Sequence, residues 1–335
     1  MYLIVIIVGL ALIFDFTNGF HDAANSIATI VSTKVLTPFL AVLWAAAFNF
    51  IAFFVFKEHK VAGAIAGIVS SELISYHLIL SATVAAISWN LLTWYYGIPS
   101  SSSHTLIGGL AGAAIAAAGG FSGVNSAPVI KAVVFMVLSP FIGLILAFIV
   151  TIFVVNISKK SNPYRAEKRF KRFQLISSAA LSLAHGGGDS QKTMGLIFTA
   201  LWFYTKTQGN NDPLESFKMP DWLPLSCYAA IALGTMSGGW RIVKTMGNRI
   251  TKVTPLEGVC AESAGALTIF LTVLLGIPVS TTHTITGSII GVGATKRLSA
   301  VRWGVTIGLV WAWVLTIPVS AIIAMILYWI LKFFI

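Results

Sequence analysis

The chain is poor in charge: Lys, Arg, Asp and Glu make up 10% of its 335 residues, whereas soluble domains average about 25%. Hydrophobic residues account for 57%. This composition excludes an ordinary soluble globular protein. Acidic residues are scarcest, with 11 against 22 basic residues, so a carboxylate within an apolar segment is a functional candidate.

Cysteine is also rare. Cys227 and Cys260 lie within or beside apolar segments, where free thiols behave as small hydrophobic groups, so we expect neither a disulfide nor a metal site there. The first fourteen residues lack the basic region and the A-x-A-like cleavage site of a secretory signal peptide. The first apolar stretch is therefore expected to remain as a helix.

Long apolar runs dominate what is present. Residues 35–56, 132–158, 222–240 and 303–331 each approach or exceed the ~20 residues that span the hydrocarbon core of a bilayer. Residues 78–130 contain no charged side chain and, at about 1.5 Å per helical residue, are long enough to cross more than once. The sequence therefore predicts an all-α polytopic membrane protein, with one membrane domain filling the chain.

The net charge of +11 comes from basic residues clustered in short segments between apolar runs, which is the positive-inside pattern and not a nucleic-acid footprint. The richest cluster predicts a cytoplasmic loop at residues 156–172. It separates an N-terminal half, residues 1–155, from a C-terminal half, residues 173–335. Charge places residues 206–221 and both chain termini outside, in an inner (plasma) membrane, so the two halves begin on opposite sides.

The two halves are repeats. Residues 97–105 read Gly-Ile-Pro-Ser-Ser-Ser-Ser-His-Thr, and residues 276–284, 179 positions later, read Gly-Ile-Pro-Val-Ser-Thr-Thr-His-Thr. A weaker match pairs residues 19–25 with residues 186–192, 167 positions later, and aligns Asp22 with Asp189. Because the halves begin on opposite sides, we predict inverted-topology repeats with broken helices, an architecture in which secondary transporters bind substrate and coupling ions near the midplane.

The hydroxyl motifs predict an anion site. In each, Gly-Ile-Pro ends one helix and the hydroxyls begin the next, so the segments resemble re-entrant hairpins. Free backbone N–H groups and the positive end of the helix dipole bind anions there. The alternative is that these side chains only cap or join helices. The predicted phosphate ligands are the hydroxyls and the two carboxylates, namely Ser101, Ser102, Ser103, Ser280, Thr281, Thr282, Asp22 and Asp189.

The acidic motifs predict a cation site. Carboxylates with nearby amide oxygens, and glycines that let the backbone open, form an all-oxygen ligand set for a hard cation. A bridging cation, or a proton on phosphate, would reconcile these carboxylates with an anion. Asp22 and Asp189 can instead lie at the membrane boundary, and interfacial placement is equally open for two glutamates. The predicted sodium ligands are Asp22, Asn25, Asp189, Gln191, Glu72 and Glu262. The neighbouring His104 and His283 are expected to make structural hydrogen bonds.

The motifs closely resemble those of the inorganic phosphate transporter (PiT) family, which pairs G-x-x-D-x-A-N with P-x-S-x-x-H in each half. Residues 19–25 match the first element, with His21 where many members carry Asn. In the second copy, Gly188 and Lys192 each stand where the family motif has Asn. The resemblance covers nearly the whole chain. It implies phosphate uptake driven by sodium or protons in a prokaryotic membrane, by a homodimer, with no cofactor beyond the co-transported ions.

Several readings compete with sodium-coupled phosphate symport by alternating access. Proton-coupled phosphate transport and sulfate transport belong to the same class. An anion channel would line its pore with Arg or Lys, yet Lys192 is the one basic residue among the motifs. An intramembrane hydrolase needs a base-oriented nucleophile, which the Ser–His spacing does not supply.

The predicted orientation can be tested by cysteine labelling in a cysteine-free variant. A cysteine near Lys168 should react with an impermeant reagent only from the cytoplasmic side, and one near Asn211 only from outside, because basic loops are retained inside. The reverse pattern would overturn the orientation.

Overall fold

The computed structural model describes residues 2–210 and 212–334. Asn211, near which one labelling cysteine is to be placed, lies outside the described residues. Helices make up nearly all of it. The α-helices are α1 Tyr2–Ser32, α2 Pro38–Val55, α3 Lys60–Ala66, α4 Tyr76–Tyr96, α5 Ser102–Ala118, α6 Ser126–Ser158, α7 Pro163–Thr207, α8 Trp222–Ser237, α9 Trp240–Asn248, α10 Pro255–Leu274, α11 Thr281–Lys296 and α12 Trp303–Phe334. Short 3-10 turns lie at Phe121–Gly123, Leu214–Ser216 and Leu298–Ala300.

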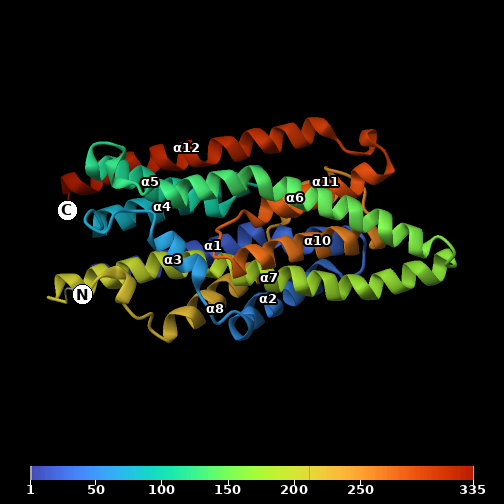
Figure 1. The fold of residues 1–335 in the computed structure, drawn as a ribbon, viewed down its shortest axis with the longest axis horizontal. Coiled ribbons are helices and arrows are strands. Elements are labelled where there is room, and N and C mark those ends of the chain that lie inside the picture. The colour runs from blue at the N-terminus through green and yellow to red at the C-terminus, as the bar shows by residue number, and fades with distance from the viewer. Residues whose placement is uncertain (1, 211, 335) are drawn as a thin grey trace.

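The helices run side by side along one long axis (Figure 1). Six of them, α1, α2, α4, α6, α10 and α12, are long and apolar enough to cross a membrane. Both ends of the chain lie at one end of the bundle, and the connection between α6 and α7 lies at the other (Figure 1). The side of the membrane that each end of the bundle faces stays a prediction.

The predicted loop at residues 156–172 is wrong in its extent, because most of that segment is helical and only residues 159–162 connect α6 to α7. Asn162 caps α7 by accepting hydrogen bonds from the backbone N–H groups of Tyr164, at 3.1 Å, and Arg165, at 3.3 Å. Pro163 occupies the first helical position, where its missing N–H costs nothing. Lys and Arg are good helix formers, so the basic cluster extends α7.

Two helical hairpins carry the hydroxyl motifs, as the sequence predicts. In the first, α4 ends at Gly97, whose left-handed φ of 67° closes the helix, and α5 begins after Ser101. In the second, Gly276 has a φ of 65° and α11 begins after Ser280. A non-glycine residue would be strained at either turn. The Gly-Ile-Pro sequence therefore breaks each apolar run at the same place in the two halves.

The acidic motifs lie on helices that are not broken. Both α1 and α7 continue without interruption through Asp22 and Asp189, so the prediction that their glycines open the backbone is wrong. These glycines permit close helix packing instead. A methyl group added at Gly19 would come within 2.2 Å of the carbonyl oxygen of Ile231, and one at Gly186 within 2.6 Å of that of Asn49.

The same kind of contact joins the hairpins to the outer helices. A methyl group at Gly112 of α5 would lie 2.2 Å from the carbonyl oxygen of Ala321 on α12, and one at Gly291 of α11 would lie 2.3 Å from that of Leu144 on α6. These two glycines are 179 positions apart, the offset of the hydroxyl motifs. The repeat in the sequence thus extends to how the hairpins pack.

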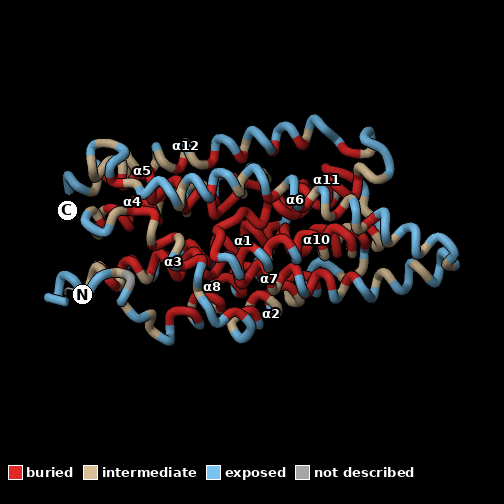
Figure 2. The backbone as a smooth tube through the Cα atoms, viewed as in Figure 1, coloured by how far each residue is buried: buried red, intermediate tan, exposed pale blue. Residues whose placement is uncertain are grey.

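The main contacts between helices each have an equivalent in which the two halves change places. The helix α1 packs on α8 and α9, as α7 packs on α2 and α3, and α5 packs on α12 as α11 packs on α6. Figure 2 shows buried backbone at the centre of the bundle and exposed backbone along α12 and the far end of α6 and α7. Each half therefore completes its core with helices from the other.

We expect Gly112→Ala to destabilise the protein, because the added methyl would overlap a backbone oxygen of α12. Overpacking of this kind costs about 1–3 kcal/mol. Gly308→Ala on α12 is the control, since nothing lies within 4 Å of the added carbon and Ala favours helix. Thermal unfolding in detergent should show a lower midpoint for Gly112→Ala alone; equal midpoints would contradict the packing argument.

Candidate functional site

The tips of the two hairpins meet inside the bundle. The hydroxyl of Ser103 on α5 donates to the carbonyl oxygen of Val279 beside α11, at 3.1 Å. The rings of His104 and His283 have centroids 5.0 Å apart. The N-termini of α5 and α11, which come from different halves, therefore face a common region, and both bring free backbone N–H groups to it.

Two of the six predicted hydroxyl ligands are helix caps. The Oγ atom of Ser101 accepts a hydrogen bond from the backbone N–H of His104 at 3.3 Å, and Ser280 does the same for His283 at 3.1 Å. These hydroxyls hold the first turn of α5 and α11 in shape. The other four hydroxyls, at positions 102, 103, 281 and 282, lie on the first helical turn and are buried.

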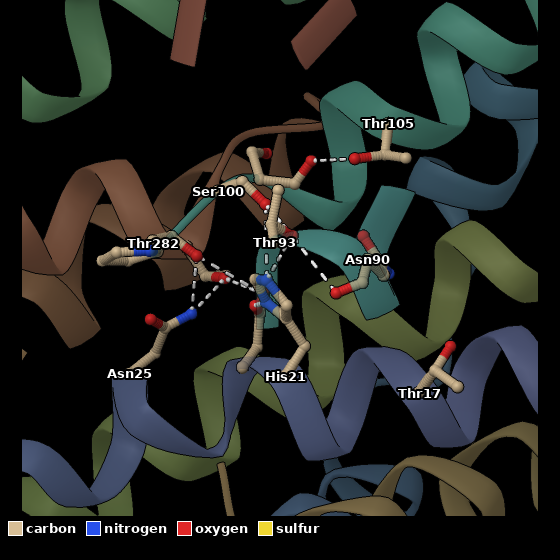
Figure 3. A network of polar contacts seen from close by, with 12 residues as sticks. Thr17, His21, Asn25, Asn90, Thr93, Ser100, Thr105 and Thr282 are labelled. Carbon is tan, nitrogen blue, oxygen red and sulfur yellow. Dashed lines mark hydrogen bonds and ion pairs between the residues drawn. The ribbon is translucent and has the colours of Figure 1, made fainter. Parts of the chain in front are cut away.

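Asp22 on α1 lies against the hydroxyl motif of the other half. Its Oδ2 atom is 3.5 Å from the hydroxyl of Thr281 and 3.4 Å from that of Thr282. The amide nitrogen of Asn25 donates to the same two hydroxyls, at 3.2 Å and 3.0 Å (Figure 3). The amide oxygen of Asn25 has no hydrogen-bond partner among the described residues. This half of the site thus combines a carboxylate, two hydroxyls and a free amide oxygen.

The second carboxylate of the site, Asp189 on α7, faces the hydroxyl motif of the N-terminal half. Its Oδ1 atom is 2.5 Å from the ammonium nitrogen of Lys192. Lys192 also donates to the hydroxyl of Ser103 and, at 3.1 Å, to the carbonyl oxygen of Val279. The Nε2 atom of His185 lies 3.5 Å from the other oxygen of Asp189. In both halves, the acidic motif therefore contacts the hydroxyl motif of the opposite half.

The two carboxylates converge. Asp22, His185 and Asp189 each present one possible ligand atom, and these atoms lie within 4.8 Å of one another. The two aspartates, Asn25, Lys192 and the hydroxyl residues at positions 101–103 and 280–282 are each at most 3% exposed. The site is therefore closed to solvent, and a ligand enters or leaves only when the helices around it separate.

Histidine and threonine side chains support Asp22 in a way the sequence did not predict. The Nδ1 atom of His21 is 2.5 Å from Asp22 Oδ1, and its Nε2 atom is 3.1 Å from the hydroxyl of Thr93. Ser100 in turn donates to Thr93 at 2.9 Å (Figure 3). The signal available in the sequence was the position of His21 directly before Asp22. Its partners on α4 and the hairpin turn could be found only from the tertiary structure.

Three predicted sodium ligands, Glu72, Gln191 and Glu262, do not reach the converging carboxylates. Glu72 lies exposed in the turn before α4. Gln191 is buried, but its side-chain oxygen accepts from the backbone N–H of Val61 at 3.0 Å, because position 191 faces α3. Glu72 and Gln191 are therefore set apart from this site. The structural counterpart of Asn25 is Lys192, three residues after its aspartate as Asn25 is three residues after Asp22.

Glu262 forms a separate buried cluster on α10. Its Oε1 atom accepts from the hydroxyl of Thr29 at 2.5 Å and from the amide of Gln174 at 2.8 Å. Its Oε2 atom accepts from Ser177 at 2.5 Å. Thr29 lies one helical turn beyond Asn25 on α1, so this cluster is beside the motifs rather than among them. The side chain of Glu262 is fully buried among these donors.

One of the two motif histidines makes the expected structural hydrogen bond, because the Nδ1 atom of His283 lies 3.5 Å from the carbonyl oxygen of Met136 on α6. The ring of His283 stacks on Trp313 of α12 with centroids 3.9 Å apart. Trp313 donates its indole N–H to the carbonyl oxygen of Pro99 at 3.1 Å. Neither ring nitrogen of His104 has a partner in the part of the chain that the structure describes. The Ser–His pairs show no base-oriented nucleophile, which leaves the hydrolase reading without support.

Comparisons with known proteins point to one family. The model of the phosphate transporter family matches residues 18–165 and again residues 154–324, once in each half. A protein of Rhizobium meliloti (strain 1021) named "Probable low-affinity inorganic phosphate transporter" is 50% identical over 97% of this chain and 96% of its own length. A Bacillus subtilis (strain 168) protein of the same name is 44% identical over 99% and 98%.

A solved structure described as "The sodium-dependent phosphate transporter" has the same fold. It superposes with a TM-score of 0.88 over 100% of both chains, at 26% identity. The relatives and this structure are named as transporters, which separates the protein from the enzyme and channel readings. The spanning helices, the paired motifs and these matches together show that the chain is a multi-pass membrane protein and belongs to the phosphate transporter family.

Proposed function

We propose that this protein takes up inorganic phosphate by sodium symport, with phosphate and sodium bound together where the two hairpin tips meet. The observation that carries this proposal is the convergence of two buried carboxylates and two hydroxyl-bearing helix N-termini, one of each from either half. An anion site and a cation site thereby share one closed space, which is what coupled transport requires.

Phosphate would bind at the first turns of α5 and α11. Backbone N–H groups and helix dipoles favour an oxyanion there, and the hydroxyls of Ser102, Ser103, Thr281 and Thr282 add donors. A protonated phosphate oxygen can donate to Asp22 or Asp189, whereas sulfate carries no such proton near neutral pH. The paired carboxylates therefore favour phosphate over sulfate.

Sodium would bind beside Asp22. The carboxylate, the free amide oxygen of Asn25 and the hydroxyls of Thr281 and Thr282 form an all-oxygen set suited to a hard cation. Neutral oxygens of this kind are not needed to carry a proton. Sodium also has an electrical advantage, since each charge moved across 100 mV is worth about 2.3 kcal/mol and an anion alone would enter against an inside-negative potential. The matched solved structure is named as sodium-dependent.

Glu262 is a candidate for a further sodium ion. Thr29, Gln174 and Ser177 surround its carboxylate with oxygen-bearing side chains, and all of them are buried or nearly so. A carboxylate at this depth needs compensation, which hydrogen bonds supply in part and a cation would complete.

Proton coupling is the second candidate, because His21 lies 2.5 Å from Asp22. A histidine in contact with a carboxylate can pass a proton to it. The bacterial relatives are named for phosphate without a coupling ion.

Transport would proceed by alternating access between two inverted repeats. The sequence alone suggested that the hairpins move against the apolar helices. The glycine contacts of α5 with α12 and of α11 with α6 favour a different division, in which each hairpin moves together with its outer helix against the bundle around α1 and α7. We place the protein in a prokaryotic inner membrane as a homodimer, with both termini outside.

Removing hydroxyls should weaken phosphate binding. We expect Ser102→Ala/Ser103→Ala and Thr281→Ala/Thr282→Ala each to raise the dissociation constant at least tenfold, because a buried oxyanion loses ~1–3 kcal/mol per missing donor. Isothermal calorimetry on purified protein measures this. Thr268→Ala/Thr272→Ala on α10 is the control, since these hydroxyls bond only to their own helix. Unchanged isotherms in both site variants would mean that the hydroxyls only pack helices.

The coupling ion can be identified in proteoliposomes. At fixed pH, initial uptake of radiolabelled phosphate should rise with external sodium, and Asp22→Asn should abolish uptake while the variant still elutes as a folded protein in detergent. The loss is expected because the cation site would lack its charge. Uptake that ignores sodium but accelerates with an inward proton gradient would transfer the assignment to proton symport.

A further inference from the structure

We propose that the ammonium group of Lys192 is a tethered cation that fills one of the two cation positions at the carboxylate pair, so that this transporter couples one fewer mobile cation to each phosphate. The inference rests on the proposed function, in which cations bind at these carboxylates. It concerns a residue that departs from the family motif, where Asn stands at this position.

The two halves place different groups at equivalent positions. Asn25 and Lys192 are 167 positions apart, as are Asp22 and Asp189. Asn25 donates to the hydroxyl of Thr282 at 3.0 Å, and Lys192 donates to the hydroxyl of Ser103, which is 179 positions before Thr282. Both offsets are those of the repeat. Lys192 therefore stands where its half would otherwise carry a second asparagine.

Asn25 and Lys192 act toward a cation in opposite ways. An asparagine can offer a cation its amide oxygen, and that of Asn25 has no partner within residues 2–210 and 212–334. An ammonium group has three donors and no lone pair. Those of Lys192 are directed to Asp189, Ser103 and the carbonyl oxygen of Val279. Three oxygens at this position are thus already in contact with a positive charge, whereas the Oδ2 atom of Asp189 has no hydrogen-bond partner among the described residues.

Lys192 and Asp189 form a buried ion pair. The side chain of Lys192 is 3% exposed and that of Asp189 is fully buried, with 2.5 Å between their charged atoms. A second cation among the same oxygens would meet a like charge with little water to screen it. Asp22 is contacted by His21 and two threonine hydroxyls instead of a lysine, and the amide oxygen of Asn25 beside it has no partner among the described residues, so we assign the mobile ion to this half. With one ion instead of two at the carboxylate pair, each transport cycle moves one positive charge fewer with the phosphate.

The coupling count can be measured directly. Proteoliposomes with the membrane potential set by potassium and valinomycin are given a sodium gradient, and the phosphate gradient that just stops net flux gives the number of sodium ions per phosphate. Lys192→Asn should raise this number by one and make uptake more sensitive to potential. Lys296→Asn is the matched control, because Lys296 is also ion-paired, to Glu257 at 2.8 Å, but lies outside the site.

The mirror variant tests the same idea from the other half. Asn25→Lys should lower the count by one, because it places a second ammonium beside Asp22. This variant keeps Lys192, so it decides the matter if Lys192→Asn does not fold. A count equal to that of the unmodified protein in every folded variant would overturn the proposal. So would a higher phosphate KM in Lys192→Asn at an unchanged count, since Lys192 would then bind the anion.

The number of cations per phosphate tests this proposal whether the coupling ion is sodium or a proton. If uptake ignores sodium and follows protons, sodium symport fails, and the same measurement is made with a pH gradient. A difference of one proton per phosphate between Lys192→Asn and the unmodified protein would still support the tethered cation. Equal proton counts would overturn it.

Discussion

The burial of two carboxylates at the centre of a membrane protein is the constraint on which the rest of the structure depends. A charge at the middle of a bilayer costs at least ~2.5–3.5 kcal/mol on insertion scales, so Asp22 and Asp189 persist only with compensation. The structure compensates them differently. Asp22 has His21 and two threonine hydroxyls, whereas Asp189 has the ammonium group of Lys192. This difference makes a symmetric framework chemically asymmetric.

Compensation requires close contact between halves, and small residues provide it. Threonine hydroxyls on the hairpin that begins α11 contact Asp22, and Ser103 on the hairpin that begins α5 contacts Lys192, which is the ion-pair partner of Asp189. These hairpins reach the centre because glycines let them pack on α6 and α12 at backbone distance. Between helices in a membrane, such packing replaces the hydrophobic driving force that acts in water. The same contacts suggest which helices move as one body.

The ends of the helices shape the proposed anion site as much as the side chains do. Gly97 and Gly276 stop their helices in the left-handed conformation, and Ser101 and Ser280 cap the helices that follow. Each cap satisfies one backbone N–H and leaves neighbouring N–H groups of the first turn available. The hydroxyl motif is thus divided between residues that shape the helix end and residues that are free to contact an anion.

The sequence by itself determined the membrane class, the hairpins at Gly-Ile-Pro, the repeat offsets and the identity of the two central carboxylates. These features are local, because they follow from hydropathy, from glycine and proline conformation and from matching letters. The loop predicted from the sequence was too long, and the predicted breaks in α1 and α7 are absent. Glycine permits both an open backbone and a close helix contact, and only the partner helix decides between them. Which hydroxyl the amide of Asn25 or the ammonium of Lys192 contacts was likewise decided by the tertiary structure. Asn25 meets Thr282 and Lys192 meets Ser103 across more than 80 residues of chain, because the folding of each half against the other brings them together.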